Sequence, residues 1–163
     1  MTETLKILAA IDFSEASAEA LHWGAALARR SGGEVVLLAV TDWPGRPAGT
    51  LDAGFPAFYD ADNGLRILLE RRLAALAKAA PGLAGKDPQR LVRFGTPDVE
   101  IVKAARETEA DLIVMGTRGR KGVRRALLGS VAENVLRNAP CAVTVVRQGV
   151  HPAPEKLMRL MAI

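Results

Sequence analysis

The chain has 163 residues, of which 49% are hydrophobic, 25% are charged and only 4% are aromatic. This length and composition are typical of one globular domain that buries a single core. One cysteine, Cys141, excludes a disulfide framework and a cysteine-rich metal cluster. No run of about eighteen apolar residues is available to cross a membrane, and strand-like sequence begins by Leu5, which leaves no room for a signal peptide. We therefore expect a soluble, cytoplasmic protein.

Short apolar runs along the chain predict five β-strands, with helices between them. Continuous apolar runs of this length are typical of parallel strands that are covered on both faces. Ser14 is expected to cap the first helix, Thr96 and Pro97 to open the third, and Ser130 with Glu133 to form a capping box on the fourth. The alternation predicts an α/β fold with a doubly wound parallel sheet and right-handed crossovers. The strands are expected at 6–12, 34–40, 91–94, 112–115 and 142–146, and the helices at about 15–30, 65–80, 97–108 and 130–139.

A glycine-containing loop follows the predicted fourth strand. Gly116, Gly119 and Gly129 are followed by Ser130, where an apolar helix begins. A strand, a glycine loop and a helix N-terminus together form a natural cradle for phosphate, because glycine permits close backbone approach and the helix start offers free N–H groups. The loop is not a Walker A sequence, and it lacks the Gly-x-Gly pair of a dinucleotide fingerprint.

The positive charge of the chain is concentrated in the same loop. The net charge is +4 and the pI is about 9.6, values that are compatible with nucleic-acid binding. A basic stripe confined to one glycine loop favours a small polyphosphate over a long duplex, and no aromatic residues alternate with the cations to stack on single strands. We therefore expect no nucleic-acid partner. The basic residues of the loop are Arg118, Arg120, Lys121, Arg124 and Arg125.

The residues 110–147, ADLIVMGTRGRKGVRRALLGSVAENVLRNAPCAVTVVR, closely resemble the universal stress protein family in its ATP-binding branch. KILAAIDFSEAS near the start and EVVLLAVTD after it resemble the same family. The resemblance implies one domain over 1–148 with a C-terminal tail at 149–163. It also implies a Rossmann-like, adenine nucleotide alpha hydrolase-like fold with strand order 3-2-1-4-5. The family pattern does not extend to the tail.

The resemblance assigns roles to individual residues. Asp12 matches the aspartate that contacts the nucleoside, and the position of Val40 offers backbone groups to the adenine. The phosphates are assigned to Gly116, Gly119, Gly129 and Ser130, with charge-assisted contacts from Arg118, Arg120 and Lys121. The implied cofactor is ATP, with any Mg²⁺ carried by the phosphates. Neither His22 nor His151 lies at metal-ligand spacing, and no protein metal site is predicted.

Each role has a structural alternative that the residues leave open. The negative charge of Asp12 can stabilise the N-terminus of the first helix through the helix dipole. Gly129 and Ser130 can simply cap the fourth helix. Val40 can be an ordinary strand residue, and the loop cations can be solvated. The irregular stretch at 41–64 can be a cover for the site or a patch that packs on the second helix.

The last strand, Ala142–Val146, reads as an edge strand without lysine or proline. The family's usual dimer joins this strand to its symmetry mate, so a homodimer is expected, and a proline at Thr144 is expected to disrupt it. The loop contains no general base and no water-positioning Gln or Glu, which favours nucleotide binding with little turnover. The alternatives are a slow ATPase or nucleotide hydrolase, and a nucleotide-free dimeric interaction module.

Overall fold

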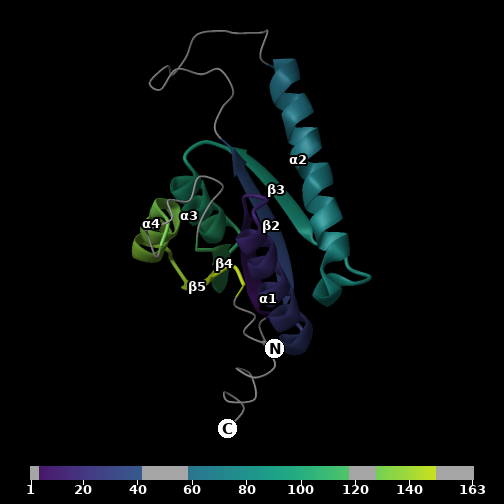
Figure 1. The fold of residues 1–163 in the computed structure, drawn as a ribbon, viewed down its shortest axis with the longest axis vertical. Coiled ribbons are helices and arrows are strands. Elements are labelled where there is room, and N and C mark those ends of the chain that lie inside the picture. The colour runs from purple at the N-terminus through teal and green to yellow at the C-terminus, as the bar shows by residue number, and fades with distance from the viewer. Residues whose placement is uncertain (1–3, 42–58, 118–127, 150–163) are drawn as a thin grey trace.

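A computed structural model describes residues 4–41, 59–117 and 128–149 of the chain. Its five strands form one parallel sheet in the order β3-β2-β1-β4-β5, which confirms the expected order (Figure 1). The helices lie on both faces of the sheet, as the doubly wound prediction requires. The elements are β1 (Lys6–Ile11), α1 (Glu15–Ser31), β2 (Glu34–Thr41), α2 (Tyr59–Ala79), the 3-10 turn η2 (Pro81–Leu83), β3 (Gln89–Phe94), α3 (Pro97–Glu107), β4 (Leu112–Gly116), α4 (Ser130–Asn138) and β5 (Ala142–Val146).

The sheet divides the core into two layers. Alternate residues of β1 point to opposite faces, so that Ile7 and Ala9 pack beneath α1 and α2, whereas Leu8 packs beneath α3 and α4. The three central strands are buried on both faces, which explains their continuous apolar runs. Side chains that are completely or almost completely buried include Ile7, Leu8, Leu37, Leu38, Ile113 and Val114.

Local sequence signals account for three helix ends. Ser14 caps α1 by accepting a hydrogen bond from the Ser17 N–H at 3.2 Å. Gly32 ends the same helix in the left-handed conformation, with a φ of 70°. Pro97 occupies the first turn of α3, although the Thr96 side chain makes no capping hydrogen bond. The capping residues Ser14 and Gly32 therefore set the limits of α1, and Pro97 sets the start of α3.

The prediction for α2 was wrong at its start. The helix begins at Tyr59, six residues before the expected Leu65, and it continues through Gly64. The run YDADNG contains glycine, asparagine and aspartate, which favour turns over helix. Its inclusion shows that helix propagation from the apolar face at Leu69 and Leu73, both buried against the sheet, outweighs these local preferences.

The capping box predicted for α4 is absent. The N-cap is Gly129, with extended dihedral angles, and Ser130 is the first residue of the helix. Gly129 makes no side-chain capping bond, and the Glu133 carboxylate accepts from Arg137 at 3.0 Å instead. Ser130 is the first residue of the helix and not its N-cap. Its hydroxyl is therefore not at the position from which an N-cap side chain accepts a hydrogen bond from the first turn.

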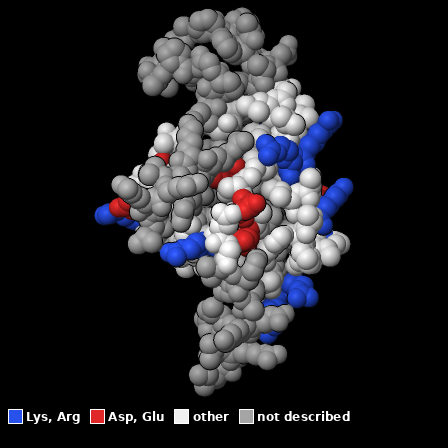
Figure 2. Space-filling model, in the orientation of Figure 1, with Lys and Arg blue, Asp and Glu red and all other residues white. Residues whose placement is uncertain are grey.

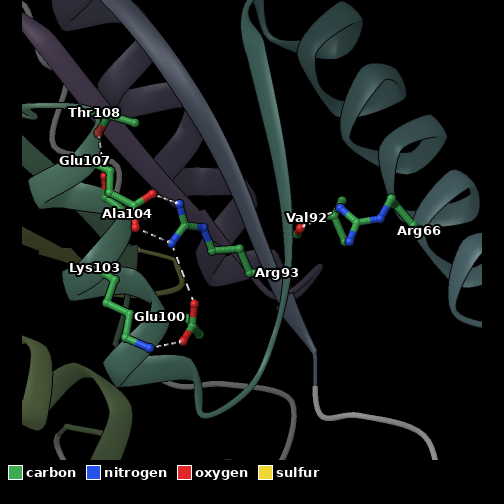
Figure 3. Close-up of polar contacts among 8 residues, drawn as sticks. All are labelled: Arg66, Val92, Arg93, Glu100, Lys103, Ala104, Glu107 and Thr108. Carbon is green, nitrogen blue, oxygen red and sulfur yellow. Dashed lines mark hydrogen bonds and ion pairs between the residues drawn. The ribbon is translucent and has the colours of Figure 1, made fainter. Parts of the chain in front are cut away.

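The two edges of the sheet differ in charge. On β3, Arg93 points toward α3 and pairs with Glu107 and, at 3.6 Å, with Glu100 (Figure 3). From α2, Arg66 donates to the Val92 carbonyl at 3.1 Å. Charged side chains of this kind discourage an edge strand from pairing with another chain. The opposite edge strand, β5, carries no charged residue within its bounds.

Candidate functional site

Those predicted site residues that the structure describes lie at one edge of the sheet, at the carboxyl ends of β1, β2 and β4. Ile11 pairs with Ala39 of β2, and Ala10 pairs with Met115 of β4. Continuing both registers places Asp12 between Val40 on one side and Thr117 on the other. The chain leaves β1 for α1 on one face and leaves β4 for α4 on the other, so this edge is the point at which open α/β sheets form a ligand crevice.

Asp12 begins a tight turn from β1 into α1. One oxygen of its carboxylate, Oδ1, accepts hydrogen bonds from the Ser14 N–H at 3.0 Å and from the Ser14 hydroxyl at 2.5 Å. Between them, Phe13 adopts a φ of +64°, which a bulky side chain rarely does. The sequence identified Ser14 only as a helix cap, and the structure adds that it orients Asp12. Within the described residues, both bonds to Asp12 use the same oxygen.

Gly116 has a packing reason to be glycine. A Cβ at this position would lie 2.9 Å from the Ala16 Cβ and 3.0 Å from the Ser17 backbone nitrogen. The end of β4 therefore passes close beneath the first turn of α1. This contact accounts for the missing side chain without any ligand, and it also holds the ends of β1 and β4 together.

Backbone hydrogen bonds of Thr117 hold the two ends of the glycine loop in place. The Thr117 N–H donates to the Val146 carbonyl at 2.9 Å, and the Thr117 carbonyl accepts from the Gly129 N–H at 2.8 Å. The two ends of the loop are therefore pinned together beyond β4, and Thr117 is buried. Sequence reasoning missed this residue, since threonine after a buried strand gives no distinctive signal. Arg118, Gly119, Arg120 and Lys121 lie outside the described residues.

The start of α4 offers hydrogen-bond donors at this edge. The Gly129 N–H is engaged by Thr117, and the first bond inside the helix runs from the Glu133 N–H to the Gly129 carbonyl at 2.9 Å. The N–H groups at 130–132 consequently have no acceptor within the helix. Ser130 is exposed, and its hydroxyl is not used to cap the helix.

Val40 lies one residue before the end of β2 and pairs with Arg93 of β3. Its side chain is half-buried against the core layer beneath α3 and α4. The next residue, Thr41, accepts the Gly95 N–H at 3.0 Å, which ties the ends of β2 and β3 together. The register of β1 and β2 thus places Val40 beside Asp12.

The remaining candidates for chemistry are metal-ligating side chains and the Cys141 thiol. Within the described ranges, no group of three or more His, Cys, Asp and Glu residues could hold a metal ion. Partial burial raises the pKa of the Cys141 thiol, so this group is protonated near neutral pH. Among the same residues, no helix is long and apolar enough to cross a membrane.

The sequence pattern of the universal stress protein family matches residues 3–147. The chain belongs to the universal stress protein family. A universal stress protein of Methanocaldococcus jannaschii, MJ0531, is 36% identical over 145 residues, which cover 88% of this chain and 82% of that protein. The family match at 3–147 includes all three segments that carried the resemblance, which are KILAAIDFSEAS, EVVLLAVTD and residues 110–147.

Solved structures share the fold. The hypothetical protein MJ0577 is 28% identical, with a TM-score of 0.70, and the likeness covers 92% of this chain and all of that one. The universal stress protein of Archaeoglobus fulgidus in complex with dAMP gives 24% identity and a TM-score of 0.59, covering 90% of this chain and 99% of that one. A universal stress protein in complex with cAMP is 23% identical, with a TM-score of 0.62, and the likeness covers 90% of this chain and 98% of that one. At these last two identities, the likeness shows the fold alone.

Proposed function

We propose that the protein binds ATP in the crevice beyond β1 and β4 and holds it with little turnover. The observation that carries the proposal is that three features lie together at the carboxyl ends of β1 and β4. They are the Asp12 turn, the hydrogen bond between Thr117 and Gly129, and the first turn of α4. A carboxylate on one side and free helix N–H groups on the other match a ribose and a phosphate chain.

Asp12 is the proposed contact of the ribose. Its Oδ1 atom is held by Ser14, so the carboxylate is oriented before any ligand arrives. The second oxygen is then free to accept a hydrogen bond from a ribose hydroxyl. In this proposal the backbone at Val40, the neighbour of Asp12 across the sheet, lies against the adenine.

The phosphates are proposed to lie over the glycine loop and the start of α4. The exposed Ser130 hydroxyl and the N–H groups of the first turn supply donors, and the helix dipole favours the negative charge. Gly116 lets the end of β4 lie close to α1 beneath this edge, while Gly129, Gly119, Arg118 and Arg120 are proposed to complete the cradle. Mg²⁺, if required, would arrive on the phosphates.

Slow turnover is proposed because the loop lacks a catalytic acid or base. Residues 116–130 contain no Asp, Glu, His or Gln that could position a water molecule. The closest acidic residue of α4, Glu133, accepts a hydrogen bond from Arg137. An alternative in the enzyme class, a slow ATPase, would release ADP from ATP over hours of incubation, which chromatography measures directly.

Two proteins of this fold were solved with adenine monophosphates, dAMP and cAMP. They support an adenine nucleotide as the ligand class and leave the number of phosphates to experiment. Denaturing the purified protein and identifying the released nucleotide tests the class. Titration with ATP, ADP, AMP and cAMP then ranks them, and ATP is expected to bind most tightly. If no nucleotide is released or bound, the protein is better described as a nucleotide-free interaction module.

Replacing Asp12 with Ala tests the assignment of the ribose. Loss of a hydrogen bond to a charged group should weaken ATP binding by about 1.5–3 kcal/mol, whereas inorganic tripolyphosphate should bind as before. Calorimetry with both ligands on the same folded variant gives the comparison. Equal weakening of the two ligands would assign Asp12 to the stability of the turn instead.

A further inference from the structure

An arginine of α2 covers the strained turn beside Asp12. Phe13 is held at a φ of +64°, and its ring packs partly against the core beneath α1 and α2. The guanidinium carbon of Arg72 lies 3.9 Å from the centroid of that ring. This is a close cation–π contact between two elements that are far apart in sequence.

The Phe13 ring is one of two restraints on the same turn. The other is the pair of hydrogen bonds from Ser14 to the Asp12 carboxylate. Backbone conformations that are disfavoured in isolation persist only when the surroundings over-determine them, and such conformations concentrate at functional sites. Because Phe13 and Asp12 share a peptide bond, the position of the ring constrains the direction in which Asp12 leaves the sheet.

The contact is specific to Arg72 among the exposed cations of α2. Lys and Arg side chains line the side of the molecule on which α2 lies (Figure 2). Arg66 lies over Phe94, at 5.4 Å from its centroid, and bonds the Val92 carbonyl. Arg71 is exposed and makes no hydrogen bond, ion pair or ring contact with another residue of the described ranges. Arg71 therefore has the charge of Arg72 without its contact.

We propose that Arg72 is a positioning residue for the nucleotide. By holding the Phe13 ring, it keeps the left-handed backbone that presents Asp12 at the carboxyl end of β1. The inference rests on the proposed function for its ligand. It adds α2 to a site that is otherwise built from β1, β2, β4 and α4, and it gives Arg72 a role without contact to the ligand.

The test compares two ligands on matched variants. Arg72→Gln should weaken ATP binding by about two- to fivefold, the effect expected for losing a cation–π contact at an exposed position. Inorganic tripolyphosphate, which has no ribose, should bind unchanged. Arg71→Gln, the matched loss of charge one residue away, should affect neither ligand. Equal weakening of both ligands, or an equal effect of Arg71→Gln, would mean that α2 acts only through general electrostatics and would overturn the proposal.

A double-variant comparison shows whether Arg72 affects ATP binding through the Phe13 ring. In a Phe13→Leu protein, Arg72→Gln should cause no further loss of ATP affinity, because the aromatic face is already absent. Arg72→Lys should retain much of the affinity in the Phe13 protein, since an ammonium group also binds an aromatic face. An undiminished effect of Arg72→Gln in the Phe13→Leu background would show that Arg72 acts by another route.

A readout without nucleotide separates this inference from the proposed function. The amide resonances of residues 12–14 should shift in Arg72→Gln and stay in place in Arg71→Gln. If the wild type binds no ATP, the proposed function fails, and these resonances still decide whether Arg72 controls the turn. Unshifted resonances in Arg72→Gln would overturn the positioning role.

Discussion

Single residues at the sheet's carboxyl edge serve packing and the candidate site together. Gly116 is glycine because the first turn of α1 lies against it, and the same contact brings Asp12 and the glycine loop to one edge. Ser14 caps α1 and also orients Asp12. A substitution at such positions therefore changes stability and binding together, and only matched controls separate the two effects.

A pair of glycine substitutions tests the packing argument. Gly116→Ala should lower the free energy of unfolding by about 1–3 kcal/mol, because the added Cβ meets backbone atoms of α1 that cannot move freely. Gly64→Ala should raise it by up to about 1 kcal/mol, because Gly64 lies inside α2 and its Cβ would meet open space. Denaturant unfolding measures both. A neutral Gly116→Ala would show that α1 shifts easily, and the packing argument would then be lost.

At the scale of elements, α3 is fastened to the sheet by an ion-pair cluster on the β3 edge. Arg93 pairs with Glu107 and Glu100, and Lys103 donates to Glu100 at 2.8 Å (Figure 3). The hydrogen bond from Arg93 holds the pKa of the Glu107 carboxyl below its ordinary value. A folded-state pKa that is lowered contributes stability above the ordinary pKa and loses it as the pH falls through the lowered value.

This linkage gives a pH-dependent prediction for Glu107→Gln. The variant should be less stable than the wild type at neutral pH, and the difference should shrink as the pH falls below about 4.5, the ordinary pKa of the group. Unfolding curves recorded between neutral and acid pH measure the difference. Glu34→Gln is the control, since Glu34 is exposed and its side chain makes no ion pair with another described residue. A difference that is independent of pH would remove the ion pair from the explanation.

For the whole molecule, the two sheet edges suggest how copies assemble. The β3 edge is flanked by Arg66 and Arg93, whereas β5 has no charge and its middle residues are only partly buried. An uncharged edge strand can pair with the same strand of a second copy related by two-fold symmetry. Two-fold symmetry is the commonest closed symmetry of protein oligomers. Val143 and Val145 pack against the layer beneath α3 and α4, and Val146 packs against the other layer, as expected for the alternating side chains of a strand.

The predicted homodimer through Ala142–Val146 can be tested with proline, although not at Thr144. The Val146 carbonyl accepts from Thr117, so the backbone groups of Val146 face β4. By alternation those of Thr144 face β4 as well, and those of Val143 face the free edge. Val143→Pro should therefore give a folded monomer of about 17.3 kDa in light scattering, and the wild type is expected to give twice that mass. Thr144→Pro should instead destabilise the sheet. A monomeric wild type, or a dimeric Val143→Pro, would place the interface elsewhere.

The sequence by itself determined the fold class and the family, and it predicted the segments of the candidate site. Apolar runs of strand length, the Ser14 and Gly32 caps and the glycine spacing are local signals, and local chemistry decides them. The tertiary structure decided what depends on contacts between distant segments. Examples are the start of α2 at Tyr59, the pinning of the loop by Thr117, and the stacking of Arg72 on Phe13. These contacts join residues whose spacing in sequence carries no periodicity, because the packing of separate elements brings them together.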